Sequence, residues 1–316
     1  MKPTVFIDGA AGTTGLEIWE RLADRSDIAL IELPDAERKT ARARREALND
    51  ASLAILCLPD AAAREAVAMV ENPAVRIIDA STAHRTAPDW VFGLPELEPG
   101  QRERIAAAKR VSNPGCYSTG FVALIRPLVR AGIVPADLPL TANAVSGYSG
   151  GGKAMIEEFE DGASPRYVET VVRIYALTLA HKHVPEMQKH AGLAHPPLFA
   201  PSVGRFFRGM IVEVPLQLWA LPGRPTVAVL HTALTEAYRR EPLVEVARLE
   251  EGIVTQTLDA ELLKLSNGMK LFVFGNDKTQ QARLVAVLDN LGKGAAGAAV
   301  QNLNLMLGLP ETTGLL

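Results

Sequence analysis

The N-terminal stretch limits the possible folds of this chain more than any other. Thr4–Asp8 is a short apolar run with β-branched residues, which predicts a buried strand. Glycines follow at positions 9, 12 and 15, and a helical pattern of apolar residues runs from Leu16 to Leu22. A strand, a glycine turn and a helix in this order are typical of the phosphate site in a doubly wound α/β fold. The spacing is G-x-x-G-x-x-G rather than G-x-G-x-x-G, so the context supports the prediction more than the motif does.

The glycine turn and the strand after it contain the residues expected to hold a dinucleotide. The candidates in the turn, where backbone N–H groups can meet a pyrophosphate, are Gly9, Gly12, Thr13, Thr14 and Gly15. Residues 28–33 predict the second strand, and Glu32 near its end suits the ribose hydroxyls of NAD. Arg38 and Lys39 in the loop beyond suit the 2′-phosphate of NADP. The sequence leaves the choice between the two cofactors open.

Two different patterns of strands and helices divide the chain. Before Val111, short apolar strands alternate with helices, which predicts a doubly wound parallel sheet of Rossmann type. The strands expected there are residues 4–8, 28–33, 52–58 and 76–80. Beyond Val111 we expect an α+β domain with a mixed, largely antiparallel sheet. Its expected strands are residues 138–145, 210–216, 226–232 and 281–288, with a helix over 233–248. A further helix is expected over residues 295–307, near the end of the sequence.

Cys116 stands at the start of a predicted helix, directly after the turn-forming pair Pro114 and Gly115. The apolar-rich residues 119–130 predict that helix. Free N–H groups and the helix dipole at its N-terminus favour a thiolate, and they can hold an oxyanion formed by attack on a carbonyl. We therefore interpret Cys116 as a nucleophile rather than an inert turn cysteine. Cys57, inside an apolar strand, is interpreted as an inert core cysteine.

Three histidines cluster in the second half of the chain, at positions 181, 183 and 190. A His-x-His pair without further ligands at matched spacing is a weak signal for a metal. A general acid/base role for His181 or His183, acting with Cys116, is the better interpretation, because a neutral imidazole can accept and donate protons near pH 7.

Two further stretches can bind an anion. Residues 146–153 form a loop rich in glycine and serine that ends in Lys153, and such loops bind anions through backbone N–H groups. The loop is not a P-loop, because Ala154 follows the lysine where Ser or Thr is required. Arg205 and Arg208 are candidates for holding a carboxylate or a phosphate, with simple surface charge as the alternative.

The composition narrows the class of protein. A chain of 316 residues, 48% hydrophobic and 22% charged, can form two domains with sizeable cores. A formal net charge of −3 gives no electrostatic basis for binding nucleic acid or an anionic membrane. Two cysteines argue against a disulfide framework, and we recognise neither a signal peptide nor a membrane-spanning apolar run. We expect a cytoplasmic enzyme.

Five motifs in a fixed order carry a resemblance to one family. They are the glycine turn, residues 112–117 (SNPGCY), 146–150 (SGYSG), 181–186 (HKHVPE) and 289–297 (DNLGKGAAG). With them, the chain resembles the N-acetyl-γ-glutamyl-phosphate reductases of the aspartate-semialdehyde dehydrogenase-like superfamily, from residue 5 to about residue 309. It departs from longer members at residues 81–85, which retain Arg85 but leave the role of this loop open.

The resemblance implies an NADPH-dependent reduction of an acyl phosphate to an aldehyde, with release of phosphate. Cys116 would form a thioester, with His183 as the acid/base and His181 as the alternative. It implies an NADP-binding domain over residues 1–114, with residues 290–316 packing back on it, and a catalytic, substrate and oligomerisation domain over 115–289. Asn290 joins the cofactor contacts, and a homodimer or homotetramer is expected. The implied substrate contacts are Arg85, Asn113, Ser146, Ser149, Gly150, Arg205 and Arg208.

Other functions fit the same sequence less well. Aspartate-semialdehyde dehydrogenase and aminoadipyl-phosphate reductase share the chemistry. The presence of both residues 114–117 and residues 181–186 favours the resembled N-acetyl-γ-glutamyl-phosphate reductase of arginine biosynthesis. A non-catalytic NADP-sensing protein would be expected to have lost Cys116 or both histidines. A cysteine hydrolase would have no need of the glycine turn.

Overall fold

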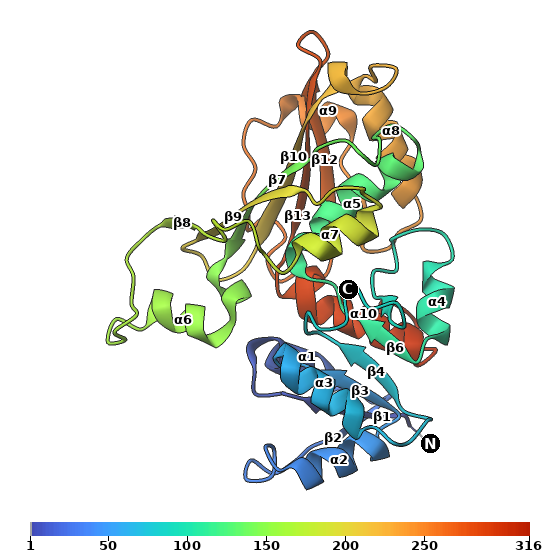
Figure 1. Ribbon diagram of the computed structural model, residues 1–316, viewed down its shortest axis with the longest axis vertical. Coiled ribbons are helices and arrows are strands. Elements are labelled where there is room, and N and C mark those ends of the chain that lie inside the picture. The colour runs from blue at the N-terminus through green and yellow to red at the C-terminus, as the bar shows by residue number, and fades with distance from the viewer. Residues whose placement is uncertain (1) are drawn as a thin grey trace. The chain divides into compact units, whose positions relative to one another are not determined.

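The first of two sheets contains the N-terminal strand and its successors (Figure 1). The computed structural model describes residues 2–316, and within them this sheet has six parallel strands in the order β2-β1-β3-β4-β6-β5. The strands are β1 (Thr4–Asp8), β2 (Ala29–Ile31), β3 (Leu53–Leu56), β4 (Arg76–Asp79), β5 (Val91–Phe92) and β6 (Arg110–Ser112). Every residue of β3 is buried, as expected for a parallel strand between layers of helices.

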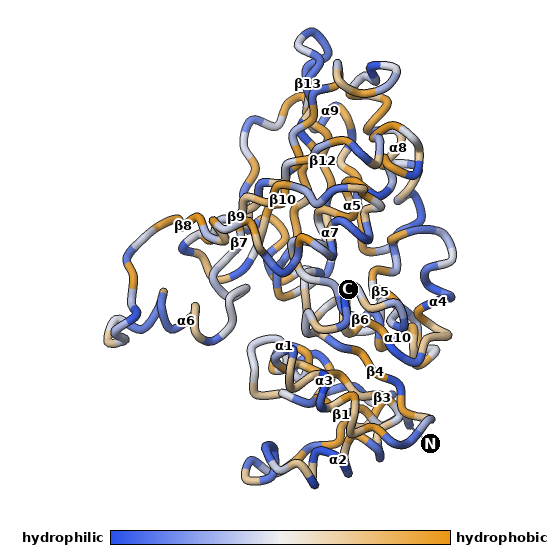
Figure 2. The backbone as a smooth tube through the Cα atoms, viewed as in Figure 1, coloured by the Kyte–Doolittle hydropathy of each residue, from blue (hydrophilic) through white to orange (hydrophobic). Residues whose placement is uncertain are grey.

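The helices of this part of the chain form two packed groups. Helix α2 packs against α3, whereas α10 packs against α1 and α4. Their bounds are α1 (Thr13–Leu22), α2 (Ala41–Asp50), α3 (Asp60–Met69), α4 (Gln101–Ala107) and α10 (Gly297–Met306). Figure 2 shows hydrophobic colour along β3 and β4, whereas α2 is largely hydrophilic because it buries only one face, through Ala43, Ala47 and Leu48.

The second sheet is mixed. Within residues 2–316 it has seven strands in the order β11-β12-β13-β10-β7-β9-β8. The pairs β11–β12 and β7–β9 are parallel, and the other neighbouring pairs are antiparallel. The strands are β7 (Thr141–Gly147), β8 (Val172–Ile174), β9 (Leu198–Gly204), β10 (Met210–Gln217), β11 (Val244–Val246), β12 (Met269–Asn276) and β13 (Gln281–Leu288). The predicted fold class, a Rossmann-type parallel sheet plus an α+β domain, is confirmed.

Helix α5 forms the centre of the layer that packs on this second sheet. It contacts β10 and β13 and packs against α7 and α8. Residues 117–125 of α5 are buried without interruption, so this helix is apolar around most of its circumference. The helices are η1 (Tyr148–Gly151), α5 (Cys116–Arg130), α6 (Gly152–Glu160), α7 (Val184–Ala191), η2 (Leu218–Ala220), α8 (Val227–Tyr238), α9 (Leu249–Val254) and the π-helical η3 (Gly292–Ala296).

The expected strand over residues 226–232 is wrong, because this stretch begins helix α8. The local alternation of apolar residues suggested a strand. The residues that α8 buries are Val227, Leu230, Leu234 and Tyr238, and their spacing of three and four is that of a helix face. The expected helix over 233–248 is correspondingly wrong in its bounds, since the chain leaves α8 after Tyr238 and enters β11 at Val244.

The chain divides into two compact units. The first comprises the residues up to Pro95 together with Gly100–Gly115 and Ala295–Leu316, and the second comprises Glu96–Pro99 and Cys116–Gly294. Thus Gly115 belongs to the first unit, and residues 290–294 belong to the second. Within residues 2–316, no helix combines the length and the apolar content needed to cross a membrane.

Candidate active site

The glycine turn of the first unit is built on two close approaches of the backbone. Gly9 has φ +91°, and a Cβ at this position would lie 2.3 Å from the carbonyl oxygen of Cys57. A Cβ at Gly15 would lie 2.3 Å from the carbonyl oxygen of Gly9. The N–H of Gly12 donates to the same Gly9 oxygen (3.0 Å) and Gly12 caps α1, whose first turn contains Thr13 and Thr14. The turn therefore requires glycine at positions 9 and 15 and directs the start of α1 to the end of β1.

A cavity of about 630 Å³ opens beside this turn. It lies at the end of β1, which pairs with β2 on one side and with β3 on the other, and such a switch point is where nucleotides bind in open α/β sheets. Glu32 in its wall accepts a hydrogen bond from Trp19 Nε1 (2.7 Å). Arg38 and Lys39 also line it, and Arg38 pairs with Asp35 at 2.9 Å in an exposed ion pair.

Arg44 is a cavity residue that the sequence analysis missed. Its guanidinium binds both carboxylate oxygens of Asp8, at 2.8 to 3.2 Å, and Asp8 is buried at the end of β1. The hydrogen bond to Asp8 raises the pKa of Arg44. The charged helix around Arg44 reads as a solvated surface in the sequence, and only its packing against β1 turns one arginine inward.

The loop over residues 81–85, whose role the sequence left open, is held by Asp79 at the end of β4. The buried carboxylate of Asp79 accepts hydrogen bonds from Ser81 N (2.9 Å), Ser81 Oγ (2.7 Å) and His84 Nδ1 (2.6 Å). The ring of His84 stacks on Trp90 with 4.2 Å between the centroids. His84 is therefore part of the loop's own framework.

Arg85 and Asn113, two expected substrate contacts, hydrogen-bond to each other in the first unit. Arg85 is buried and donates through Nε to the carbonyl oxygen of Asn113 (3.0 Å). The amide of Asn113 donates to the carbonyl oxygen of Ala295 (2.9 Å) and accepts from Asn302 Nδ2 (3.2 Å). Both side chains thus fix the segment that leads to Pro114 and Gly115, and their contact with substrate stays a prediction.

In the second unit, Cys116 is the first residue of α5. The aromatic ring of the next residue, Tyr117, contacts both candidate histidines. The ring centroid of Tyr117 lies 5.8 Å from that of His181 and 5.7 Å from that of His183. Tyr175, whose hydroxyl donates to the Tyr117 hydroxyl (2.9 Å), completes this group. Burial raises the pKa of Tyr117 and of Tyr175, and the charge of a Cys116 thiolate adds to the rise in both.

The two histidines differ in their hydrogen bonds. Their ring centroids lie 4.7 Å apart, and His181 Nδ1 accepts the backbone N–H of His183 (3.1 Å). A neutral His181 that accepts at Nδ1 carries its proton on Nε2. His183 is buried at the N-cap of α7, and Ser118 Oγ of α5 donates to its carbonyl oxygen (3.5 Å).

The predicted anion loop is attached to the turn that follows β13. Asn290 Nδ2 donates to Ser149 Oγ (2.9 Å), and Asn290 Oδ1 accepts the N–H of Gly209 (2.7 Å). Gly150 packs on Ser146, since a Cβ at Gly150 would lie 3.3 Å from Ser146 Oγ. Asn290, expected among the cofactor contacts, thus belongs to the second unit, and its amide connects loops there.

Arg205 and Arg208, the expected ligands for a substrate anion, both bind other parts of the second unit. Arg205 donates to the carbonyl oxygens of Phe159 (2.9 Å), Thr170 (3.2 Å) and Val168, and so closes the loop that follows α6. Arg208 Nε donates to Asp289 Oδ2 (2.8 Å). The structure therefore gives these arginines a bracing role, and anion binding by them stays a prediction.

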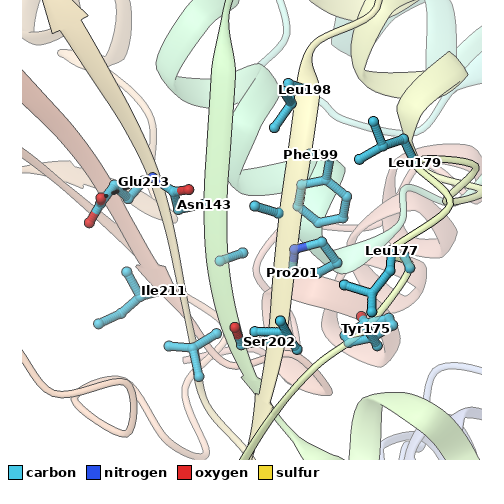
Figure 3. Close-up of a pocket in the computed structure, with 15 residues that line it drawn as sticks. Asn143, Tyr175, Leu177, Leu179, Leu198, Phe199, Pro201, Ser202, Ile211 and Glu213 are labelled. Carbon is cyan, nitrogen blue, oxygen red and sulfur yellow. Dashed lines mark hydrogen bonds between the residues drawn. The ribbon is translucent and has the colours of Figure 1, made fainter.

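An apolar groove of about 490 Å³ crosses one face of the second sheet (Figure 3). Its walls come from β7, β9 and β10, from the end of β8 and from the segment after β8. The large apolar side chains that it leaves exposed are Ile174, Leu177, Leu179 and Leu198. Tyr175 lines the groove and also binds Tyr117, and Phe199 lines it with its ring centroid 5.0 Å from that of His181. This face and the histidine cluster therefore share both residues.

Two family models match the chain along the same division. Residues 4–108 match the semialdehyde dehydrogenase, NAD binding domain, and residues 116–290 match the semialdehyde dehydrogenase, dimerisation domain. Solved structures agree in fold: aspartate semialdehyde dehydrogenase II from Vibrio cholerae aligns with a TM-score of 0.72 at 17% identity, covering 98% of this chain and 99% of that one. Aspartate semialdehyde dehydrogenase with NADP from Candida albicans aligns at 0.64 and 12%, covering 97% and 98%. The protein is of the semialdehyde dehydrogenase class.

Curated relatives narrow this class. N-acetyl-gamma-glutamyl-phosphate reductase of Brucella anthropi is 56% identical over 309 residues, which is 98% of this chain and 99% of the relative. N-acetyl-gamma-glutamyl-phosphate reductase 2 of Nostoc sp. is 53% identical over 323 residues, covering 99% of each. The chain belongs to the N-acetyl-γ-glutamyl-phosphate reductase family.

Proposed function

We propose that this protein reduces N-acetyl-γ-glutamyl phosphate to N-acetylglutamate semialdehyde, with NADPH as the reductant and release of phosphate. The observation that carries the proposal is Cys116 at the first position of α5, next to Tyr117 and the two histidines that gather around it. Sequence identities of 56% and 53% to proteins named N-acetyl-gamma-glutamyl-phosphate reductase support this choice of substrate.

The residues of the second unit suit a covalent route. The Cys116 thiolate attacks the γ-acyl carbon, phosphate leaves, and a thioester remains on the sulfur. N–H groups in the first turn of α5 favour the thiolate and stabilise the negative oxygen of each tetrahedral state. NADPH, when bound, supplies a hydride to the thioester carbon. Collapse of the resulting thiohemiacetal releases the aldehyde and the thiolate.

A histidine carries the protons in this route. We assign the role to His183, which is buried beside Tyr117, with His181 as the alternative. The assigned ring protonates the developing oxygen of the thiohemiacetal and takes the proton back as the aldehyde forms. His181 Nδ1 already accepts the N–H of His183, so His181 is suited to orient the His183 backbone.

The first unit is proposed to hold the dinucleotide at the glycine turn. Because Gly9 and Gly15 have no Cβ, the backbone segments of the turn can pack closely together, as a pyrophosphate site requires. The residues present therefore fit the cofactor. Arg38 and Lys39 are proposed to meet the 2′-phosphate of NADPH. Glu32 is already bound to Trp19, which limits its competition for the ribose.

The protein is also proposed to form a homodimer or homotetramer through the apolar groove of the second sheet. Four large exposed apolar side chains on one face favour burial against another chain. Light scattering of the purified protein and of Leu177→Asp tests this, since a charge in the groove should shift the mass toward a monomer.

The deciding experiment for the function follows NADPH formation from N-acetylglutamate semialdehyde, phosphate and NADP. Aspartate semialdehyde serves as the competing substrate in the same assay. We expect turnover with the acetylated substrate to dominate. Equal or greater kcat/KM for aspartate semialdehyde would contradict the proposed substrate.

A further inference from the structure

The turn that follows β13 comes into direct contact with Cys116. A Cβ at Gly294 would lie 2.8 Å from the Cys116 Cβ and 3.4 Å from its Cα. The first distance is shorter than any real contact between such atoms. Gly294 shows no positive φ, so the need for glycine comes from the close approach and not from backbone conformation. The start of α5 therefore rests on a backbone that has no side chain at this position.

The same turn is fixed from within by Asp289, which is fully buried. Its Oδ1 accepts the N–H groups of Leu291 (2.8 Å) and Gly292 (3.1 Å), and its carbonyl oxygen accepts the N–H of Gly294 (2.9 Å). Its Oδ2 accepts Arg208 Nε (2.8 Å) and the N–H of residue 265 (2.6 Å). One carboxylate thus sets the path of the chain from residue 289 to residue 294.

Lys293 anchors the turn to another segment of the second unit. Its Nζ lies 2.7 Å from Glu96 Oε1, and the two side chains are 0% and 1% exposed. A buried ion pair is costly to form, and losing one partner strands the other charge in the interior. Residues 292–296 form a π-helical turn, a rare geometry that is frequent at functional sites. Catalysis as described above uses neither Lys293 nor Gly294.

We propose that Gly294 is a positioning residue for Cys116, and that the Lys293–Glu96 pair anchors the turn that presents it. This inference rests on the proposed role of Cys116 as the nucleophile. A methyl group at position 294 must push the Cys116 Cβ away from its place at the head of α5. A displacement of the nucleophile near 1 Å can lower turnover by about 100-fold.

The test compares Gly294→Ala with Gly162→Ala, a matched control in which the added Cβ meets no atom within 4 Å. For Gly294→Ala we expect kcat to fall by about 100-fold, while KM for NADP stays within about twofold. The rate at which iodoacetamide alkylates Cys116, read by mass spectrometry, should change beyond the scatter between wild-type and Gly162→Ala proteins. A folded Gly294→Ala protein with wild-type kcat and alkylation overturns the proposal.

The Lys293 variants carry the test if Gly294→Ala does not fold. Lys293→Met should lower both kcat and the melting temperature, whereas the double variant Glu96→Gln/Lys293→Met removes both charges and should recover the melting temperature while kcat stays low. Recovery of kcat together with the melting temperature in the double variant, or no loss in Lys293→Met, counts against the anchor. Full activity of Cys116→Ser would instead contradict the proposed function, so the two failures are distinguishable.

Discussion

The two cysteines of this protein stand in opposite surroundings. Cys57 follows β3 in the first unit, and burial of its thiol, with the charges of Asp79 and Asp8, raises its pKa to about 12. Cys116 opens α5 in the second unit, where the helix N-terminus favours negative charge. At Cys57 the carbonyl oxygen matters, because it lies beneath Gly9 and shapes the nucleotide turn. At Cys116 the thiol is the proposed nucleophile, so comparing the two cysteines tests whether the element around a cysteine decides if its sulfur can react.

The largest expected effect separates the two sulfurs directly. Replacing Cys116 by Ser should lower kcat by a factor on the order of 10⁴ or more, because the hydroxyl is a poor nucleophile without a dedicated base. Cys57→Ala should keep kcat near that of the wild type. Steady-state rates with N-acetylglutamate semialdehyde, phosphate and NADP measure both. Comparable losses in the two variants would remove the contrast.

Variants of the two histidines test the proposed chemistry at Cys116. His183→Asn should lower kcat by roughly 10²- to 10⁴-fold, the range for a lost general acid/base. His181→Asn should cost less, since its Nδ1 serves as an acceptor for the His183 backbone. Rate measurements across pH 6 to pH 9 distinguish the two, because the working histidine contributes an ionisation that disappears with it. A larger loss in His181→Asn would exchange the roles.

The preference between NADPH and NADH tests the region around Cys57, which contains the glycine turn and the cavity beside it. The double variant Arg38→Ala/Lys39→Ala should lower the NADPH over NADH ratio of kcat/KM by about 10- to 100-fold, the value of one or two charged hydrogen bonds. Lys109→Ala, at another lysine on the first unit, is the control. An unchanged ratio, or a wild-type ratio near one, would exclude these side chains as 2′-phosphate ligands.

The last expected effect concerns stability rather than catalytic rate: a pH dependence of unfolding caused by Cys57. The pKa of its thiol rises from an ordinary 9.0 to about 12, so above pH 9 the unfolded chain releases a proton that the folded chain keeps. The unfolded state then binds fewer protons, and the free energy of unfolding should fall by about 1.4 kcal/mol per pH unit up to the folded pKa. Urea unfolding of wild-type and Cys57→Ala proteins from pH 8 to pH 11 should show this slope only in the former. Parallel curves would mean that the thiol is solvated.

Much of the fold follows from local sequence patterns. The strand–glycine–helix start, the apolar β3 and the final strand over residues 281–288 were all expected where the structure has them. The expectation was wrong over residues 226–232, where a short alternating window resembled a strand. The longer spacing of the buried residues in α8 shows the helix, and only the sheet it packs against makes that face recognisable.

The candidate site was predictable in its residue types but not in its connections. The sequence pointed to Cys116, His181 and His183 through their motifs. It did not indicate Tyr175, which is separated from Tyr117 by a long stretch of chain and meets it only in the fold. It left Arg205 and Arg208 as candidates for an anion or as surface charges, because an arginine in a loop offers no sign of its partners. In the fold they bind backbone carbonyls and Asp289.

By itself, the sequence determined that a nucleotide turn opens the chain and that a cysteine begins a helix, because glycine, proline and apolar periodicity act over a few residues. The tertiary structure decided which charged and polar groups meet. It paired Lys293 with Glu96 and brought Gly294 against Cys116, although long stretches of chain separate each pair. Such contacts depend on where the sheets and helices pack, since burial and close approach are properties of the folded chain and not of any local segment.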